Sequence, residues 1–171
     1  LGGNTLTAKS DSAVFNIKNG AQVSISNGAF TSDSAETVIY TDSDGVLTLN
    51  NVTTPQNEKS IYVNYPSKLI LDGANSDVTV YLHDGTFEQK NGTSRLSSDL
   101  SIVNNIKLYG GRVATYNIGK TNMFSLIDDG YSFELSDSAM FNDFVRSISS
   151  GLSFSVKKGS VITEQPQDIT A

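Results

Sequence analysis

A short pattern of apolar and polar positions recurs along the chain. In Val23–Phe30, every second residue of the first half is apolar, and an Asn-Gly pair precedes a closing aromatic residue. Alternation places the apolar side chains on one face of a β-strand, and Asn and Gly readily adopt the positive φ of a turn. Class for class, the closest copy is Val80–Phe87, and looser copies are Leu47–Val52, Leu69–Ala74 and Ile106–Val113. The pattern predicts many short strands that each end at a turn.

The copies recur with a period in the low twenties. Val23, Leu47 and Leu69 begin three successive copies, and the two steps between them are nearly equal. A second apolar run precedes each of these copies by eight or nine residues, beginning at Val14, Val38 and Ile61. Such a period is typical of solenoid proteins. The chain lacks the leucine framework of leucine-rich repeats and any helical pattern between the runs, so a parallel β-helix is favoured, with strands stacked about 4.8 Å apart.

The spacing between the copies changes after Leu69. Val80 follows Leu69 at about half the earlier step, and Ile106 follows Val80 after slightly more than a full step. We interpret Val78–Phe87 as an extra strand on a third face or as a short coil, and the polar residues 88–99 as a long loop. The predicted fold is therefore all-β: a single-stranded parallel β-helix, expected to be right-handed, over residues 1–120.

Beyond residue 120 the pattern differs. Phe124–Leu126 and Tyr131–Leu135 alternate on either side of Asp129-Gly130, which predicts a hairpin. Apolar residues at helical spacing from Met140 to Ile148 predict a short helix. An uncovered solenoid end would expose core and strand edges. We therefore predict that residues 121–158 cap the last coil and that 159–171 are a linker or the first strand of a following domain.

Charge and composition exclude several function classes. The chain has 12 basic and 18 acidic residues, a net charge of −6, and no basic stripe, which argues against nucleic-acid binding. No apolar run approaches the ~20 residues that span a bilayer, so this segment is not expected to insert into a membrane. The absence of cysteine excludes disulfides and thiolate metal sites. We expect no cofactor and no metal.

The repeats resemble those of a known group of proteins. Val23–Phe30 and Val80–Phe87, with Asn-Gly or Asp-Gly before an aromatic residue, are similar to the Gly-rich β-solenoid repeats of large bacterial cell-surface proteins. In that group a segment such as Ser125–Phe133 often follows the last coil. Separately, Ile162–Thr170 resembles the entry strand of bacterial immunoglobulin-like domains. These resemblances imply an extracellular, adhesin-like or stalk module, flanked by further domains of the same chain.

Other candidate chemistry has simpler explanations. His83, the only histidine, takes the outward position equivalent to Ser26 and is expected to face solvent; the Gly-x-Ser-x-Gly motif of serine hydrolases is absent. Thr41–Gly45 resembles the start of a calcium loop but lacks the distal bidentate Glu, so a tight turn explains it better.

Clustered carboxylates leave an enzymatic alternative open. β-Helix lyases and glycosidases carry acidic residues on one outer strip, and glycoside hydrolysis needs two carboxyl groups about 5–5.5 or 6.5–9.5 Å apart. Four acidic residues are candidates on adjacent coils: Asp72, Asp77, Asp84 and Glu88. Asp72 and Asp84 also occupy turn positions, where Asp has a backbone role. No catalytic residue is assigned.

Tyrosines give the candidate binding surface. Tyr62, Tyr81 and Tyr109 lie in or beside predicted strands, and Tyr65 and Tyr116 are further candidates. Stacked on one face they would form an aromatic platform for sugar rings or for a protein partner. Tyrosine is also common in any sheet, so a purely structural role stays open.

Two hypotheses from different classes follow. The first is a non-enzymatic β-solenoid module of an extracellular bacterial surface protein that acts as a stalk or adhesive surface, with a glycan or a cell-surface protein as partner. The second is a polysaccharide-binding or polysaccharide-degrading β-helix. The sequence names no ligand.

Overall fold

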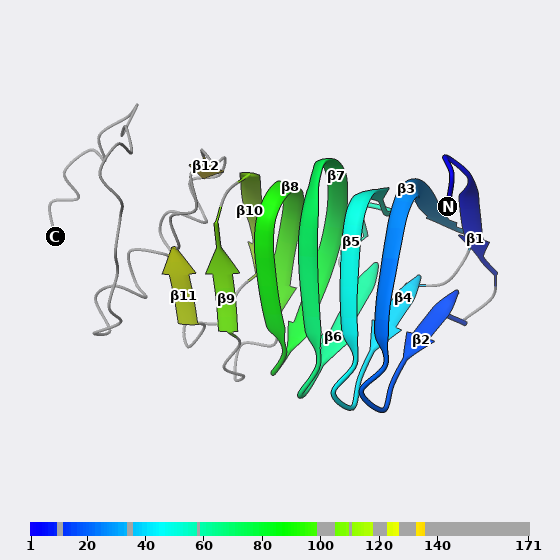
Figure 1. Ribbon diagram of the computed structural model, residues 1–171, viewed down its shortest axis with the longest axis horizontal. Helices are drawn as coiled ribbons and strands as arrows, with labels where there is room; N and C mark the ends of the chain where they lie inside the picture. The colour runs from blue at the N-terminus through cyan, green and yellow to red at the C-terminus, as the bar shows by residue number, and fades with distance from the viewer. Residues whose placement is uncertain are drawn as a thin grey trace, which may run out of the picture.

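A computed structural model describes the backbone of residues 1–9, 12–33, 36–57, 59–98, 105–109, 111–117, 123–126 and 133–135, and side chains as far as residue 113. Every regular element in these ranges is a β-strand, and every strand pair is parallel. The strands stack side by side along one axis (Figure 1). The predicted parallel β-solenoid is confirmed. The described residues include no helix able to cross a membrane.

Three columns of strands form the faces of the solenoid. The first column contains the initial halves of four long strands and two short ones: β3 (Gln22–Ser32), β5 (Val46–Thr53), β7 (Lys68–His83), β8 (Thr86–Ser98), β9 (Asn105–Leu108) and β11 (Met123–Leu126). The second column joins the later halves of the long strands to β1 (Thr5–Ala8), β10 (Gly111–Asn117) and β12 (Phe133–Leu135). The third column contains β2 (Phe15–Ile17), β4 (Ile39–Thr41) and β6 (Ile61–Asn64), and continues into the ends of β7, β8 and β10. A coil that the structure describes completely therefore contributes one strand segment to each column.

The register of the first column defines the coils. Aligned positions in this column are Val23, Leu47, Leu69, Phe87, Ile106 and Phe124. The steps between them are longest at the N-terminal end and become shorter after Leu69. The coils shorten because β7 runs directly from the second column into the third, where the preceding coil has a loop between β5 and β6. Of the two interpretations of Val78–Phe87, the strand on a third face of the same coil is the correct one as far as His83, whereas Phe87 already belongs to the next coil.

The register also corrects the repeat alignment. Val80 pairs with Ile61 in the third column, so Val80–Phe87 spans the end of β7, a turn and the start of β8. Its resemblance to Val23–Phe30 is therefore not a structural equivalence. Any strand, turn and strand with an Asn-Gly or Asp-Gly pair produces the same short pattern.

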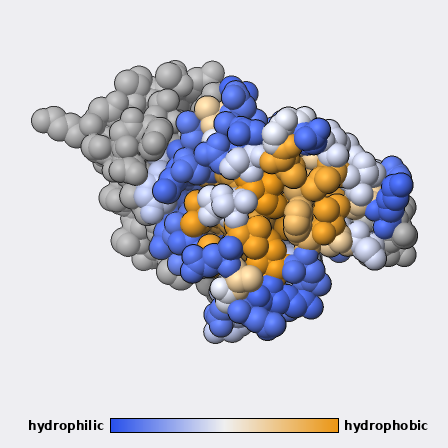
Figure 2. Space-filling model, turned by 45° about the vertical axis from the view of Figure 1, so that its right-hand side comes forward, coloured by the Kyte–Doolittle hydropathy of each residue, from blue (hydrophilic) through white to orange (hydrophobic). Residues whose placement is uncertain are grey.

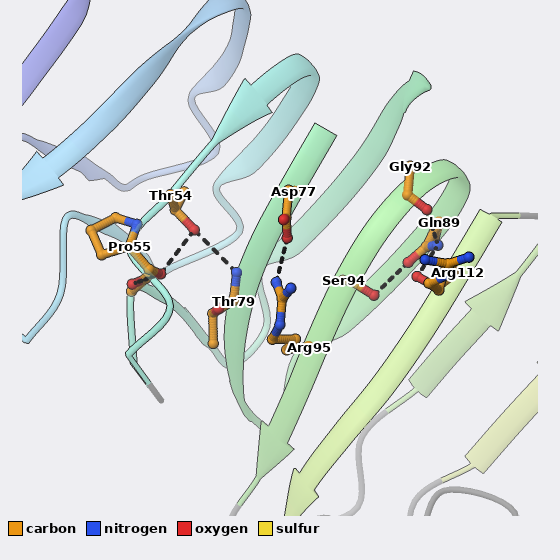
Figure 3. A network of polar contacts seen from close by, with 10 residues as sticks. Thr54, Pro55, Asp77, Thr79, Gln89, Gly92, Ser94, Arg95 and Arg112 are labelled. Atoms are coloured by element: carbon orange, nitrogen blue, oxygen red, sulfur yellow. Dashed lines mark hydrogen bonds and ion pairs between the residues drawn. The ribbon is translucent and has the colours of Figure 1, made fainter. Parts of the chain in front are cut away.

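The predicted long loop at residues 88–99 is wrong, because β8 extends through Ser98. Its polar residues do not suggest a strand, but several of them point inward and bond to each other. Gln89, which is fully buried, accepts a hydrogen bond from Ser94 Oγ at 2.5 Å and donates to the carbonyl oxygens of Gly92 and Arg112 at 3.1 and 3.2 Å (Figure 3). A polar interior is tolerated where every group finds a partner.

The predicted hairpin in the cap is also wrong. Phe124–Leu126 lies in β11, which pairs in parallel with β9, and Phe133–Leu135 forms β12, which pairs in parallel with β10. The parallel stacking thus continues beyond residue 120, to Leu135. The predicted short helix at 140–148 and the predicted linker at 159–171 lie outside the described residues.

Aliphatic side chains from successive coils fill the interior. Leu47, Leu49, Leu69 and Leu71 have no exposed surface. Near the N-terminal end the burial is incomplete: the partly buried apolar residues that pack on this core are Leu1, Leu6, Val14, Phe15 and Val23. Figure 2, in which this end comes forward, shows a hydrophobic surface bordered by hydrophilic residues.

The corner between the first two columns depends on residues that tolerate positive φ. Asn27 and Asn51 have φ of 54° and 53°, and Oδ1 of Asn51 accepts a hydrogen bond from the amide of Asn75 at 3.2 Å. Two and three coils beyond Asn51, Gly92 and Gly111 both have φ of 91°. A Cβ atom on Gly92 would lie 2.5 Å from the carbonyl oxygen of Gly73, so only glycine fits there.

Candidate functional site: a strip of stacked tyrosines

Three tyrosines project from the third column on successive coils. In β4, β6 and the end of β7, the residues that flank each tyrosine are buried: Ile39 and Thr41, Ile61 and Val63, Val80 and Leu82. Since side chains alternate along a strand, the residue between each buried pair points outward. Tyr40, Tyr62 and Tyr81 are in register through these strands, and each is half-buried. We call these three residues the tyrosine strip.

The rings of the tyrosine strip stack on one another. The ring centroids of Tyr40 and Tyr62 are 5.2 Å apart with an interplanar angle of 26°. Those of Tyr62 and Tyr81 are 5.1 Å apart at 31°. This spacing is set by the distance between neighbouring strands, about 4.8 Å. The strip therefore follows the solenoid axis, with one ring for each of three successive coils.

Polar side chains form a second row beside the rings. Asp42, Asn64 and His83 each stand two positions after a tyrosine of the strip, and Asn64 pairs with His83 in the β6–β7 register. Nδ2 of Asn64 lies 3.2 Å from the hydroxyl of Tyr40 and 3.4 Å from Oδ1 of Asp42, and the His83 ring centroid lies 6.1 Å from that of Tyr62. Each of these three coils thus presents one aromatic ring and one hydrogen-bonding side chain.

The charge beside the strip is nearly balanced. Nζ of Lys59 lies 5.6 Å from the ring centroid of Tyr81, within cation–π range. The same ammonium group is 3.8 Å from a carboxylate oxygen of Glu36, and both side chains are largely exposed. Lys59 therefore has a counter-charge already and leaves no large positive field for an anionic ligand.

The predicted binding residues separate into two groups. Tyr62 and Tyr81 lie together in the strip, whereas Tyr109 follows β9 in the first column, where its amide donates to the carbonyl oxygen of Gln89. Tyr65 lies beyond the end of β6 and is 60% exposed. The side chain of Tyr116 lies outside the described residues.

Sequence reasoning missed Tyr40 as a member of the site. The signal was present: Tyr40 stands seven residues before Leu47, and Tyr62 stands seven residues before Leu69. An offset shared between coils places both side chains in one column.

The stacking changes what the tyrosines offer a ligand. Tyr62 has a ring on each side, whereas Tyr40 and Tyr81 each turn one ring face towards Tyr62. Tyrosine has an apolar body and a polar tip. The strip presents ring edges and a row of hydroxyl groups.

The candidate catalytic carboxylates are engaged with cations. Asp77 forms an ion pair with Arg95 of the next coil (Figure 3), and Asp72 lies 4.0 Å from Nζ of Lys90. Glu88 lies between Lys68 and Lys107, at 2.9 and 3.3 Å. Asp84 is exposed in a turn with φ of 60°. Three of the four carboxylates are thus held by basic side chains.

Two opposing effects act on Glu88. Burial raises the pKa of Glu88, and the hydrogen bonds and charges of Lys68 and then Lys107 lower it; the lysines prevail, so the pKa lies below its ordinary value of 4.5. A general acid needs a raised pKa. Glu88 is instead held as a carboxylate, which suits a structural ion pair between coils.

The proposed calcium-like segment is a turn. Ser43 and Asp44 have positive φ, and the amide of Gly45 donates to the carbonyl oxygen of Asp42 at 3.0 Å. Oδ1 of Asp42 accepts a hydrogen bond from the amide of Ser43 at 2.6 Å. In the part of the chain that the structure describes, no three His, Asp or Glu residues are grouped so as to hold a metal ion.

Comparison with known proteins adds no relative. No protein-family model, no curated protein and no solved structure matches this chain.

Proposed function

We propose that this chain is a non-enzymatic β-solenoid module of an extracellular bacterial surface protein, in which the stacked coils act as a stalk and the tyrosine strip is an adhesive surface. The observation that carries the proposal is the alignment of Tyr40, Tyr62 and Tyr81 on the outer face of three successive coils. Tyrosine is enriched in interfaces because it combines a large contact area with a polar tip.

The solenoid supports the stalk half of the proposal. Each coil is built on the preceding one by parallel pairing, so added coils lengthen the molecule along a single axis (Figure 1). Since every strand position on a face repeats at the coil spacing, a surface displayed on this scaffold is held rigidly in register.

The carboxylates favour binding over degradation of a polysaccharide. Hydrolysis requires two carboxyl groups at a set separation, one of them protonated. Here Glu88 is held as a carboxylate by two lysines, and Asp77 and Asp72 each contact a basic side chain. The strip, in contrast, is a row of hydrogen-bonding groups, and the cation beside it, Lys59, lies close to Glu36.

The extracellular assignment rests on sequence features. The chain has no cysteine, and its repeats resemble those of bacterial surface proteins. On this proposal the partner is a glycan or a cell-surface protein, and the module is flanked by further domains.

The test is a binding assay with the purified module immobilised on beads. A glycan panel and a panel of extracellular matrix proteins are applied to the wild type and to the triple variant Tyr40→Ser, Tyr62→Ser and Tyr81→Ser, with Tyr109→Ser as the matched control. We expect at least one ligand to be retained by the wild type and the control and lost by the triple variant. Circular dichroism establishes that each variant is folded.

Two outcomes contradict the proposal. One is binding that is equal in the wild type and the folded triple variant, or no binding to either panel. The other is new reducing ends or unsaturated products after incubation with polysaccharides, which would make the module an enzyme.

A further inference from the structure

We infer that the ligand of the tyrosine strip is an extended, uncharged hexose polymer that lies along the solenoid axis, with one sugar unit for each coil; this rests on the binding function proposed above. The basis is the match between the repeat of the strip and the repeat of the polymer, together with the balance of charge around it.

The strip has a fixed repeat. Its ring centroids are separated by 5.2 and 5.1 Å, and Asp42, Asn64 and His83 repeat beside them in the same coil order. A ligand that places one monomer against each of the three coils needs monomers of a similar length. A hexopyranose unit in an extended β-linked chain has about that length.

Other polymers fit this spacing poorly. An extended peptide advances about 3.3 Å per residue, and side chains on one face repeat at about 6.7 Å. A peptide laid along the axis would therefore fall out of step with the rings within the length of the strip. A nucleic acid would meet a chain of net charge −6.

The polar groups favour a neutral, hydroxyl-rich ligand. Since both faces of the central ring, Tyr62, are covered by stacking, the contacts at the centre of the strip come from ring edges and phenolic hydroxyls, and from the amide of Asn64 and the imidazole of His83, whose Nδ1 is buried. These are donors and acceptors for sugar hydroxyls. Lys59, the cation at the strip, is already close to Glu36, so an acidic sugar would gain no unpaired positive charge from it.

Length dependence is the first test. Affinities of cello-oligosaccharides, from the disaccharide to the hexasaccharide, are measured by isothermal titration calorimetry. We expect the affinity to increase with length until the three coils of the strip are covered and then to level off. Malto-oligosaccharides, whose α-linkages make the chain coil, should bind more weakly at each length. Equal affinity for the two series would overturn the repeat match.

Removal of single hydroxyl groups is the second test. Tyr62→Phe retains the stacked ring and deletes one oxygen, so the fold is preserved while one contact is lost. A hydrogen bond of about 1 kcal/mol corresponds to about a fivefold loss of affinity. Tyr109→Phe, in the first column, should leave the affinity unchanged. Unchanged binding by Tyr62→Phe would overturn the inference.

The outcome also separates this inference from the function on which it rests. If strip variants abolish binding to a matrix protein while no cello-oligosaccharide binds, the adhesive function stands and the hexose polymer is wrong. If neither class of ligand depends on the strip, both proposals fail.

Discussion

Nζ of Lys68 lies 2.9 Å from Oε1 of Glu88, which belongs to the next coil of the solenoid. Lys107, one coil further still, approaches the same oxygen at 3.3 Å. Glu88 is only 7% exposed, so its charge is shielded from water and depends on the two ammonium groups. One carboxylate thus connects three consecutive coils across the first column.

Replacement of Glu88 tests this connection. We expect Glu88→Gln to reduce the free energy of unfolding by about 1–2 kcal/mol at pH 7, because hydrogen bonds to charged groups are lost. The pKa of Glu88 is lower in the folded chain than in the unfolded chain, so its stabilisation is present above pH 4.5 and disappears as the pH falls through the folded-state pKa. Urea denaturation of both proteins at pH 7 and pH 3 measures the difference.

The matched control is Asp84→Asn, at an exposed turn where Asn tolerates the φ of 60°. It should be nearly neutral at both pH values. If Glu88→Gln lowered the free energy of unfolding by the same amount at pH 3 as at pH 7, the ion pairs would not be the cause of the loss.

Glycine is required where two coils meet at the corner. Gly92→Ala places a methyl group 2.5 Å from the carbonyl oxygen of Gly73 and forces alanine to a φ of 91°. We expect a loss of stability of about 3 kcal/mol or more, from strain and displacement of the neighbouring coil. Gly20→Ala is the control, since its φ is 71° but no atom lies within 4 Å of the added methyl group. It should lose only about 1–2 kcal/mol. If thermal denaturation showed equal losses of stability for Gly92→Ala and Gly20→Ala, the close contact between Gly92 and Gly73 would be contradicted.

Engineered cysteines report the register directly, because the chain has none of its own. Thr48 and Ile70 are paired in β5 and β7 and both side chains point outward. Their separation is near 4.8 Å, within the range of disulfides. Thr48→Cys with Ile70→Cys should therefore oxidise readily, as measured by thiol titration. Thr48→Cys with Asp72→Cys is two residues out of register and should remain reduced; oxidation of this pair in preference to the first would refute the alignment.

The tyrosine strip also contributes to stability. Tyr62 stacks on a ring at each side, and an aromatic pair is worth about 0.5–1.5 kcal/mol. We expect Tyr62→Leu to cost about 1–3 kcal/mol in urea denaturation and Tyr62→Phe to cost little. Tyr109→Leu, outside the strip, is the comparison. A loss for Tyr109→Leu as large as that for Tyr62→Leu would show that stacking is not the cause.

The fold could be predicted from the sequence because the apolar positions that fill its interior recur from coil to coil. Val23, Leu47 and Leu69 begin similar apolar alternations, and the structure aligns them in one column. The later coils are harder to assign, since they are shorter than the first ones and polar side chains such as Gln89 replace apolar ones inside. Buried hydrogen-bond networks leave no periodic apolar signal, so the sequence predicts a loop where the structure has β8.

Only part of the candidate site could be predicted from the sequence. The sequence identifies Tyr62 and Tyr81 as outward residues but not Tyr40, although its offset from Leu47 matches that of Tyr62 from Leu69. Tyr109 is grouped with them because a short motif does not reveal to which column its strand belongs. That the rings cover each other depends on side-chain rotamers, for which the sequence carries no signal.

The shortening of the coils has a consequence for self-association. An open-ended filament forms when the surface at one end of a molecule matches the surface at the other, copy after copy. Here the winding from Val23 to Leu47 is longer than the winding from Ile106 to Phe124. A wide rung set against a narrow one would leave some backbone groups without a partner, so the first and last of the described rungs do not present the matching surfaces that such a filament requires.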